Sequence, residues 1–107
     1  MIIYVDLDNV LCTQDQKDKS RYTLAEPIIG NIDRLNNLYD DGHIIAIWTA
    51  RGTGSKLDFS ELTKQQLDSW GVKYHFLKFG KPNYDVFIDD RAFNSFDDYE
   101  KSTESMG

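Results

Sequence analysis

Four short apolar runs, rich in β-branched and aromatic residues, constrain the fold of this chain more than any other feature. They lie at residues 2–5, 44–48, 74–77 and 86–88. Uninterrupted apolar runs of only a few residues are typical of strands that are buried on both faces, as in a parallel sheet. The sequence therefore predicts four strands of a parallel sheet.

The segments between these runs carry the spacing of amphipathic helices. The first helix is predicted between Pro27 and Gly42, because proline favours a helix start and glycine a helix stop. The second is predicted to begin at the capping-box-like residues 58–61 and to end before Gly71. Strands that alternate with helices are typical of right-handed βαβ units, so we expect an α/β fold with its functional groups beyond the carboxyl ends of the strands.

The length of the chain, 107 residues, leaves room for one domain, and we expect residues 1–107 to form it. Residues 10–26, between the first strand and the first helix, are mostly polar and predict a flap-like excursion. Residues 102–107 form a polar tail that is expected to fray.

Composition excludes several classes of protein. Asp and Glu number 18 against 12 Lys and Arg, for a net charge of −6, whereas a nonspecific binder of nucleic-acid backbones needs a basic face. The lone cysteine, Cys12, excludes an internal disulfide framework. No stretch reaches the ~18 apolar residues of a membrane span, and the first residues lack the pattern of a secretory signal. We therefore expect a soluble cytoplasmic protein with no membrane partner and no strong affinity for nucleic acid.

Polar and charged side chains follow the expected strands where each strand ends. Because the carboxyl ends of parallel strands share one edge of a sheet, we expect these side chains to converge. Two carboxylates about 4 Å apart repel by roughly 4 kcal/mol at an effective dielectric near 20, so the cluster requires a cation, and Mg²⁺ is the hard cation that carboxylates bind. Enzymes that transfer phosphoryl groups use a metal ion beside a carboxylate, a hydroxyl and a lysine. The set comprises Asp6, Asp8, Thr49, Arg51, Lys81, Asp89 and Asp90.

At these residues the chain resembles the haloacid dehalogenase (HAD) superfamily of phosphohydrolases. The four motifs of that family occur in order, at residues 6–8, residues 48–51, Lys81 and residues 88–90. Within the superfamily the chain looks most like short capsule-biosynthesis type phosphatases. The resemblance implies a capless, Rossmann-like (HAD-type) three-layer sandwich with a small parallel sheet. It also implies a Mg²⁺-dependent phosphomonoester hydrolase that forms an aspartyl-phosphate and acts on a sugar phosphate, a nucleotide or a similar phosphorylated metabolite.

The resemblance further implies the roles of the acidic residues. Asp6 would be the nucleophile and a metal ligand, and Asp8 the general acid and base, with its backbone carbonyl on Mg²⁺. Asp90, with Asp89 beside it, would complete the metal site. Asn9 stands where the family usually has glycine, and asparagine tolerates the left-handed turn that this position takes.

The remaining residues would bind the phosphoryl group. Thr49 and Ala50 would contact it, and Lys81 would neutralise it together with the nucleophile. Lys78 is a rival for the lysine role, although Pro82 fixes the loop that presents Lys81. Arg51 either holds the substrate or pairs with a nearby carboxylate.

Other functions stay open. Phosphatases of nucleic-acid ends share these motifs, and a non-catalytic metal-binding or partner-binding domain could keep the same fold. A signalling receiver domain needs an aspartate after the third strand, and residues 78–80 contain none. A separate cap would need about 50 further residues, so we expect an open site that is covered only by residues 10–26 or by a neighbouring subunit of a homo-oligomer.

Overall fold

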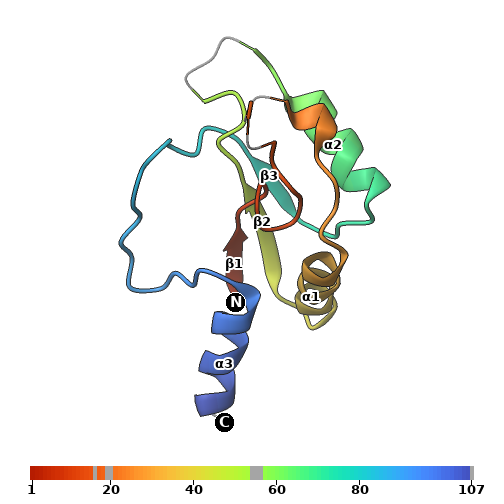
Figure 1. Ribbon diagram of the computed structural model, residues 1–107. Coiled ribbons are helices and arrows are strands. Elements are labelled where there is room, and N and C mark those ends of the chain that lie inside the picture. The colour runs from red at the N-terminus through yellow and green to blue at the C-terminus, as the bar shows by residue number, and fades with distance from the viewer. Residues whose placement is uncertain (16, 19–20, 54–56, 107) are drawn as a thin grey trace.

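The computed structural model describes residues 1–15, 17–18, 21–53 and 57–106 (Figure 1). Along the chain, the elements in this part are β1 (Ile2–Val5), the short 3₁₀ helix η1 (Tyr22–Leu24), α1 (Ile29–Asp40), β2 (Ile44–Trp48), α2 (Ser60–Ser69), β3 (Phe76–Lys78) and α3 (Phe96–Met106).

The strands form a parallel sheet. Within the described residues the sheet has three strands in the order β1-β2-β3, with Ile2 of β1 opposite Ile44 of β2 and Ala46 of β2 opposite Phe76 of β3. The crossovers between neighbouring strands place α1 and α2 over the same face of this sheet, on the right in Figure 1. The protein is therefore a small α/β domain with a parallel sheet, and at this level the prediction is confirmed.

The hydrophobic core lies between that face and the two helices. Its strand residues include Ile45 and Ile47 of β2, while Ile32 and Leu35 of α1 and Leu67 of α2 cover them. The apolar spacing of each helix thus turns one side toward the sheet, as an amphipathic helix requires.

A polar side chain marks the start of α2, and a glycine follows the end of each helix. The Oδ1 atom of Asp58 accepts a hydrogen bond from the backbone N–H of Ser60 at 2.8 Å, at the start of α2. Beyond their carboxyl ends, Gly42 and Gly71 take φ values of +95° and +71°, which glycine adopts without strain.

The fourth strand, predicted at residues 86–88, is not formed. These residues belong to the segment between β3 and α3. In Figure 1 this segment runs as a loop away from the sheet. The side chains of Val86 and Ile88 are 74% and 93% exposed. The prediction was wrong because a three-residue apolar run specifies a strand only if a neighbouring strand pairs with it.

The last helix, α3, is tied to α1. Phe96 belongs to the core, and Arg34 of α1 pairs with Asp97 at 2.7 Å and with Glu100 at 3.6 Å. The helix continues through residues 102–106, and Gly107 lies outside the described residues. In the part of the chain that the structure describes, none of the helices has the length and apolar character needed to cross a bilayer.

Candidate active site

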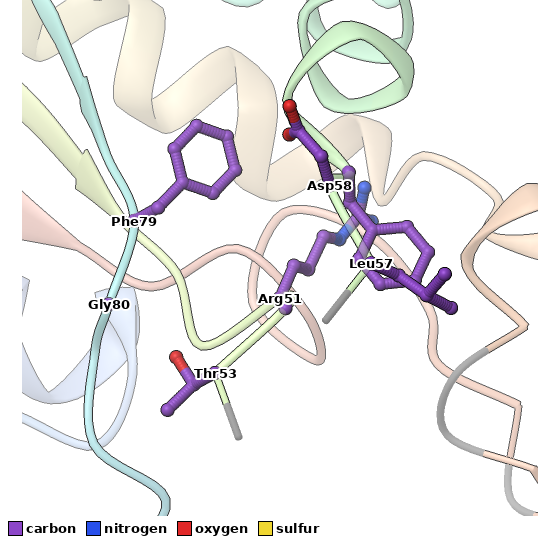
Figure 2. Close-up of a pocket in the computed structure, with 8 residues that line it drawn as sticks. Arg51, Thr53, Leu57, Asp58, Phe79 and Gly80 are labelled. Atoms are coloured by element: carbon purple, nitrogen blue, oxygen red, sulfur yellow. The ribbon is translucent and has the colours of Figure 1, made fainter. Parts of the chain in front are cut away.

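The carboxyl ends of β1 and β2 border a cavity of about 510 Å³. Its walls bring together five of the predicted site residues: Asp6, Asp8, Ala50, Arg51 and Lys81. A smaller pocket of about 250 Å³ adjoins it and shares the wall formed by residues 51–53. Figure 2 shows this pocket between the residues that follow β3, with Phe79 on one side, and those that precede α2, with Asp58 on the other.

Asp6 and Lys81 form one ion pair of the cavity wall. The Nζ atom of Lys81 lies 3.2 Å from Oδ2 of Asp6, and the backbone N–H of Leu7 donates to Oδ1 of Asp6 at 2.8 Å. Burial alone would lower the pKa of Lys81, but hydrogen bonds to Tyr84 and Asp6 and the charge of Asp6 outweigh it, so the pKa rises above its usual value. Lys81 therefore stays cationic beside a carboxylate whose side chain is 41% exposed.

The rival lysine points elsewhere. The Nζ atom of Lys78 donates to the hydroxyl of Tyr4 at 2.7 Å and lies over the Tyr4 ring at 5.1 Å from its centre. Both side chains are exposed and neither lines the cavity. Of the two lysines considered from sequence, Lys81 is the one that reaches Asp6.

Asp8 and Arg51 form the second ion pair. Arg51 donates from Nε to Oδ2 of Asp8 at 3.1 Å and from Nη2 to Oδ1 at 2.9 Å, so the pair is bidentate. The side chain of Arg51 is 0% exposed and that of Asp8 13% exposed. Of the two roles left open for Arg51, the structure shows the pairing with a carboxylate.

Three residues that were not singled out from sequence hold Arg51 in place. Its Nη1 atom donates to Oγ1 of Thr63 at 3.1 Å and to Oε1 of Gln66 at 2.6 Å, and the guanidinium carbon lies 4.6 Å from the centre of the Tyr22 ring. Thr63 and Gln66 lie three and six residues after Ser60, the first residue of α2. Both are on the side of the helix that also carries the buried Leu67. Polar residues on a core-facing side are the sequence signal that could have identified them.

Thr49 lies behind the cavity wall instead of on it. Its side chain is buried, and its Oγ1 atom accepts a hydrogen bond from the backbone N–H of Arg51 at 3.1 Å. Its backbone carbonyl accepts from the N–H of Lys81 at 3.1 Å. In the structure Thr49 thus shapes the turn after β2 and anchors the loop that presents Lys81, while Ala50 lines the cavity.

The turn after β1 places the two aspartates on one wall. Asn9 has a φ of +66°, the left-handed conformation for which this residue type is suited. The carbonyl of Leu7 accepts hydrogen bonds from the N–H groups of Val10 at 3.2 Å and Leu11 at 2.8 Å, which closes the turn.

Cys12 is packed beneath this turn. Its Sγ atom donates to Oδ1 of Asp8 at 3.4 Å. Burial, and after it the charge of Asp8, raise the pKa of the Cys12 thiol to about 12. A thiol that stays protonated is a poor nucleophile, so Cys12 fills space and supports Asp8.

The excursion of residues 10–26 is fastened at its base and at Tyr22. The N–H of Thr13 donates to the carbonyl of Glu26 at 2.8 Å, and the N–H of Glu26 donates to Oγ1 of Thr13 at 3.0 Å. Farther along, the Tyr22 ring packs edge-on against Phe59, with centres 4.9 Å apart. Residue 16 and residues 19–20 of this segment lie outside the described residues.

Asp89 and Asp90 do not join the cavity wall. The side chain of Asp90 is 88% exposed and 4.0 Å from Nε of Arg91, and Oδ1 of Asp89 accepts from the backbone N–H of Arg91 at 2.7 Å. The sheet does not bring them to Asp6 because residues 86–88 form no strand. Over the described residues, no group of three or more His, Cys, Asp or Glu side chains is gathered for a metal ion.

The chain is thus a small α/β domain with two ion pairs, Asp6–Lys81 and Asp8–Arg51, at the carboxyl edge of its sheet. No protein-family model matches the chain, and no curated protein matches it. It is similar to the crystal structure of an MCSG target protein from Vibrio cholerae, with 26% identity and a TM-score of 0.74 over 99% of this chain and 98% of that one.

It is also similar to one chain in the structure of a Pnkp1/Rnl/Hen1 complex, with 17% identity and a TM-score of 0.60. The match covers 98% of this chain but 34% of that one, so this chain spans about a third of its length. At this identity the likeness shows the fold alone.

Proposed function

We propose that this chain is a capless, HAD-type phosphomonoester hydrolase that depends on Mg²⁺ and works through an aspartyl-phosphate. The observation that carries the proposal is the placement of Asp6 next to Lys81 in a cavity whose wall also holds Asp8. A carboxylate, a fixed cation and a second carboxylate at one edge of a parallel sheet are the groups that this chemistry uses. The order of the four sequence motifs supports the same reading.

The reaction has two steps. In the first, a carboxylate oxygen of Asp6 attacks phosphorus and the bond from phosphorus to the leaving oxygen breaks. Asp8 enters this step protonated on one oxygen, keeps its other oxygen on Arg51, and gives the proton to the leaving oxygen. In the second, the oxygen of a water molecule attacks the aspartyl-phosphate, its proton goes to Asp8, and the bond from Asp6 to phosphorus breaks. The products are an alcohol and inorganic phosphate, and the proton that Asp8 gains in the second step balances the one it gives in the first.

The remaining residues position these two carboxylates. Arg51 is always protonated, so it cannot serve as the base. It donates to both oxygens of Asp8, and these two bonds fix the orientation of the Asp8 side chain. Lys81 supplies positive charge where the phosphoryl oxygens gather, and the main chain at Ala50 borders the same space.

The oxygen donors at this edge fit Mg²⁺. This ion usually binds one or two carboxylates and completes its shell with water and substrate phosphate. The Asp6 carboxylate and the backbone carbonyl of Asp8 would hold it, and the bound ion would neutralise charge on the transferring phosphoryl group. That Asp89 and Asp90 contribute to this site remains a prediction from their sequence motif.

We further propose a small phosphorylated metabolite as the substrate. The cavity volume of about 510 Å³ falls among those of small-molecule sites, which span about 300–1,000 Å³. The net charge of −6 weakens the attraction of a nucleic-acid backbone, which favours a small molecule over a nucleic-acid end.

The test is hydrolysis of p-nitrophenyl phosphate by the wild-type chain and by Asp6→Asn, each with and without Mg²⁺. We expect turnover only by the wild type and only with Mg²⁺, and acid quenching should trap phosphate on Asp6. Asp33→Asn, an exposed aspartate of α1, is the matched control and should keep wild-type rates. Wild-type turnover by Asp6→Asn would refute the aspartyl-phosphate mechanism.

A further inference from the structure

Gln66 connects two parts of the site that are far apart in sequence. Its Nε2 atom donates to the backbone carbonyl of Tyr22 at 2.7 Å, and its Oε1 atom accepts from Nη1 of Arg51 at 2.6 Å. Gln66 belongs to α2, Tyr22 to the excursion, and Arg51 to the turn after β2. One side chain therefore bonds to the flap-like segment and to the arginine that holds Asp8.

The chemistry of both bonds requires an amide. A backbone carbonyl needs a donor and a guanidinium needs an acceptor, and an amide offers one of each at the same end of its side chain. Glutamate lacks the donor, and leucine, which is of similar size, lacks both. The two partners also fix the amide in one orientation, because a flipped amide would place its NH₂ group against Arg51.

The bond to Gln66 completes the set of contacts that fixes the guanidinium plane. Nε and Nη2 of Arg51 both donate to Asp8, and Nη1 donates to Thr63 and Gln66. The Tyr22 ring, whose carbonyl is bonded to Gln66, covers the guanidinium face. A change at Gln66 therefore reaches Asp8 through Arg51 while leaving the Asp6–Lys81 pair untouched.

We propose that Gln66 is a positioning residue that couples Tyr22, in the described part of the excursion, to the orientation of Asp8, a role that rests on the proposed phosphatase function. When the excursion is seated, Gln66 and the Tyr22 ring hold Arg51, and Arg51 holds the Asp8 carboxylate toward the cavity. When Tyr22 leaves, Arg51 loses the ring over its face and Gln66 loses the partner of its Nε2 atom. The Gln66 amide is then free to turn away from Arg51, and Asp8 loses its fixed direction. Tyr22, in the described part of the excursion, thus acts on Asp8 through Gln66 and Arg51.

The test compares Gln66→Leu with Gln65→Leu. Gln65 directly precedes Gln66 in α2 and is exposed, and its Nε2 atom donates to Oε1 of Glu61 at 3.3 Å. Its variant therefore controls for the loss of an amide from this helix. With p-nitrophenyl phosphate and Mg²⁺, Gln66→Leu should lower kcat by about 10- to 100-fold, the effect of a misplacement near 1 Å, and leave KM within about twofold. Gln65→Leu should change neither constant.

A second measurement needs no turnover. Hydrogen exchange should be at least about 10-fold faster in Gln66→Leu at the amides of Leu24 and Ala25, which donate to the carbonyls of Arg21 and Tyr22. The reason is that the backbone at Tyr22 loses its hydrogen bond to α2. Gln65→Leu should exchange like the wild type. Unchanged exchange, or a fall in kcat matched by Gln65→Leu, would overturn the coupling.

The two proposals fail in different ways. If the wild type shows no phosphatase turnover, the proposed function is wrong, and the exchange experiment still decides whether Gln66 fastens the excursion. If the wild type turns over and Gln66→Leu has the same kcat, the positioning role is overturned while the phosphatase stands.

Discussion

Replacing Asp8 by asparagine should destabilise the fold much more than the same change at Asp6. The Arg51 side chain is 0% exposed, so Asp8→Asn leaves its charge buried beside a neutral amide. Removing one partner of a buried ion pair costs about 3–5 kcal/mol. Because Arg51 keeps its bonds to Thr63 and Gln66, we expect the lower end, about 3 kcal/mol.

Asp6→Asn supplies the contrast. The Asp6 side chain is 41% exposed, and solvent screens its pair with Lys81, so the loss of unfolding free energy should stay below about 1 kcal/mol. Urea unfolding followed by tryptophan fluorescence measures both variants. With an m value of about 1–3 kcal/mol/M, the midpoint of Asp8→Asn should fall by ~1–3 M.

A double variant tests the cause. Asp8→Asn combined with Arg51→Met removes the stranded charge as well, so it should be destabilised by less than the sum of the two single variants. Equal unfolding free energies for Asp6→Asn and Asp8→Asn would refute the reasoning, as would strict additivity of the double variant.

Three further predictions concern Lys81, Cys12 and Asp90. Lys81→Met should raise KM for p-nitrophenyl phosphate about 10-fold or more, since a hydrogen bond to a charged group contributes about 1.5–3 kcal/mol, and Lys78→Met is the control that should change nothing. The pKa of Cys12 is raised from 9.0 to about 12, so its unfolded thiol ionises before the folded one. Stability should fall as the pH rises from about 9 toward 12, and Cys12→Ala should flatten that fall in unfolding experiments at a series of pH values; an unchanged slope would contradict the assignment. The motif of residues 88–90, and not the observed site, assigns Asp90 to the metal, so Asp90→Asn tests the motif. The motif predicts a higher Mg²⁺ concentration for half-maximal turnover, and an unchanged value would remove Asp90 from the metal site.

The parts of the fold that were predictable from sequence are those with a local signal. β1 and β2 match their apolar runs residue for residue, and α1 and α2 lie between the proline, aspartate and glycine signals that predicted them. The convergence of Asp6, Asp8 and Lys81 followed from topology, because the ends of parallel strands share an edge.

The parts that sequence could not predict depend on distant partners. The run at residues 86–88 has strand composition but pairs with no strand in the structure, so its composition alone did not decide its conformation. The contacts of Arg51 depend on Tyr22, Thr63 and Gln66, and a residue type does not reveal which side of a helix or loop meets a buried guanidinium. Each of these contacts becomes visible only once α2 is packed on the sheet.

The hydrogen bonds between Thr13 and Glu26 close the base of the excursion close to the sheet. Because these bonds fix the two ends of the loop, a change in loop length need not move the strands. Such a change is also inexpensive, since doubling the length of a flexible loop costs only about 0.6 kcal/mol in closure entropy. Segments of other lengths could therefore be grafted between these two residues without shifting Asp6 and Asp8. For protein engineering, Thr13 and Glu26 thus mark the ends of a segment that could be exchanged while the sheet stays constant, provided that the replacement keeps Tyr22.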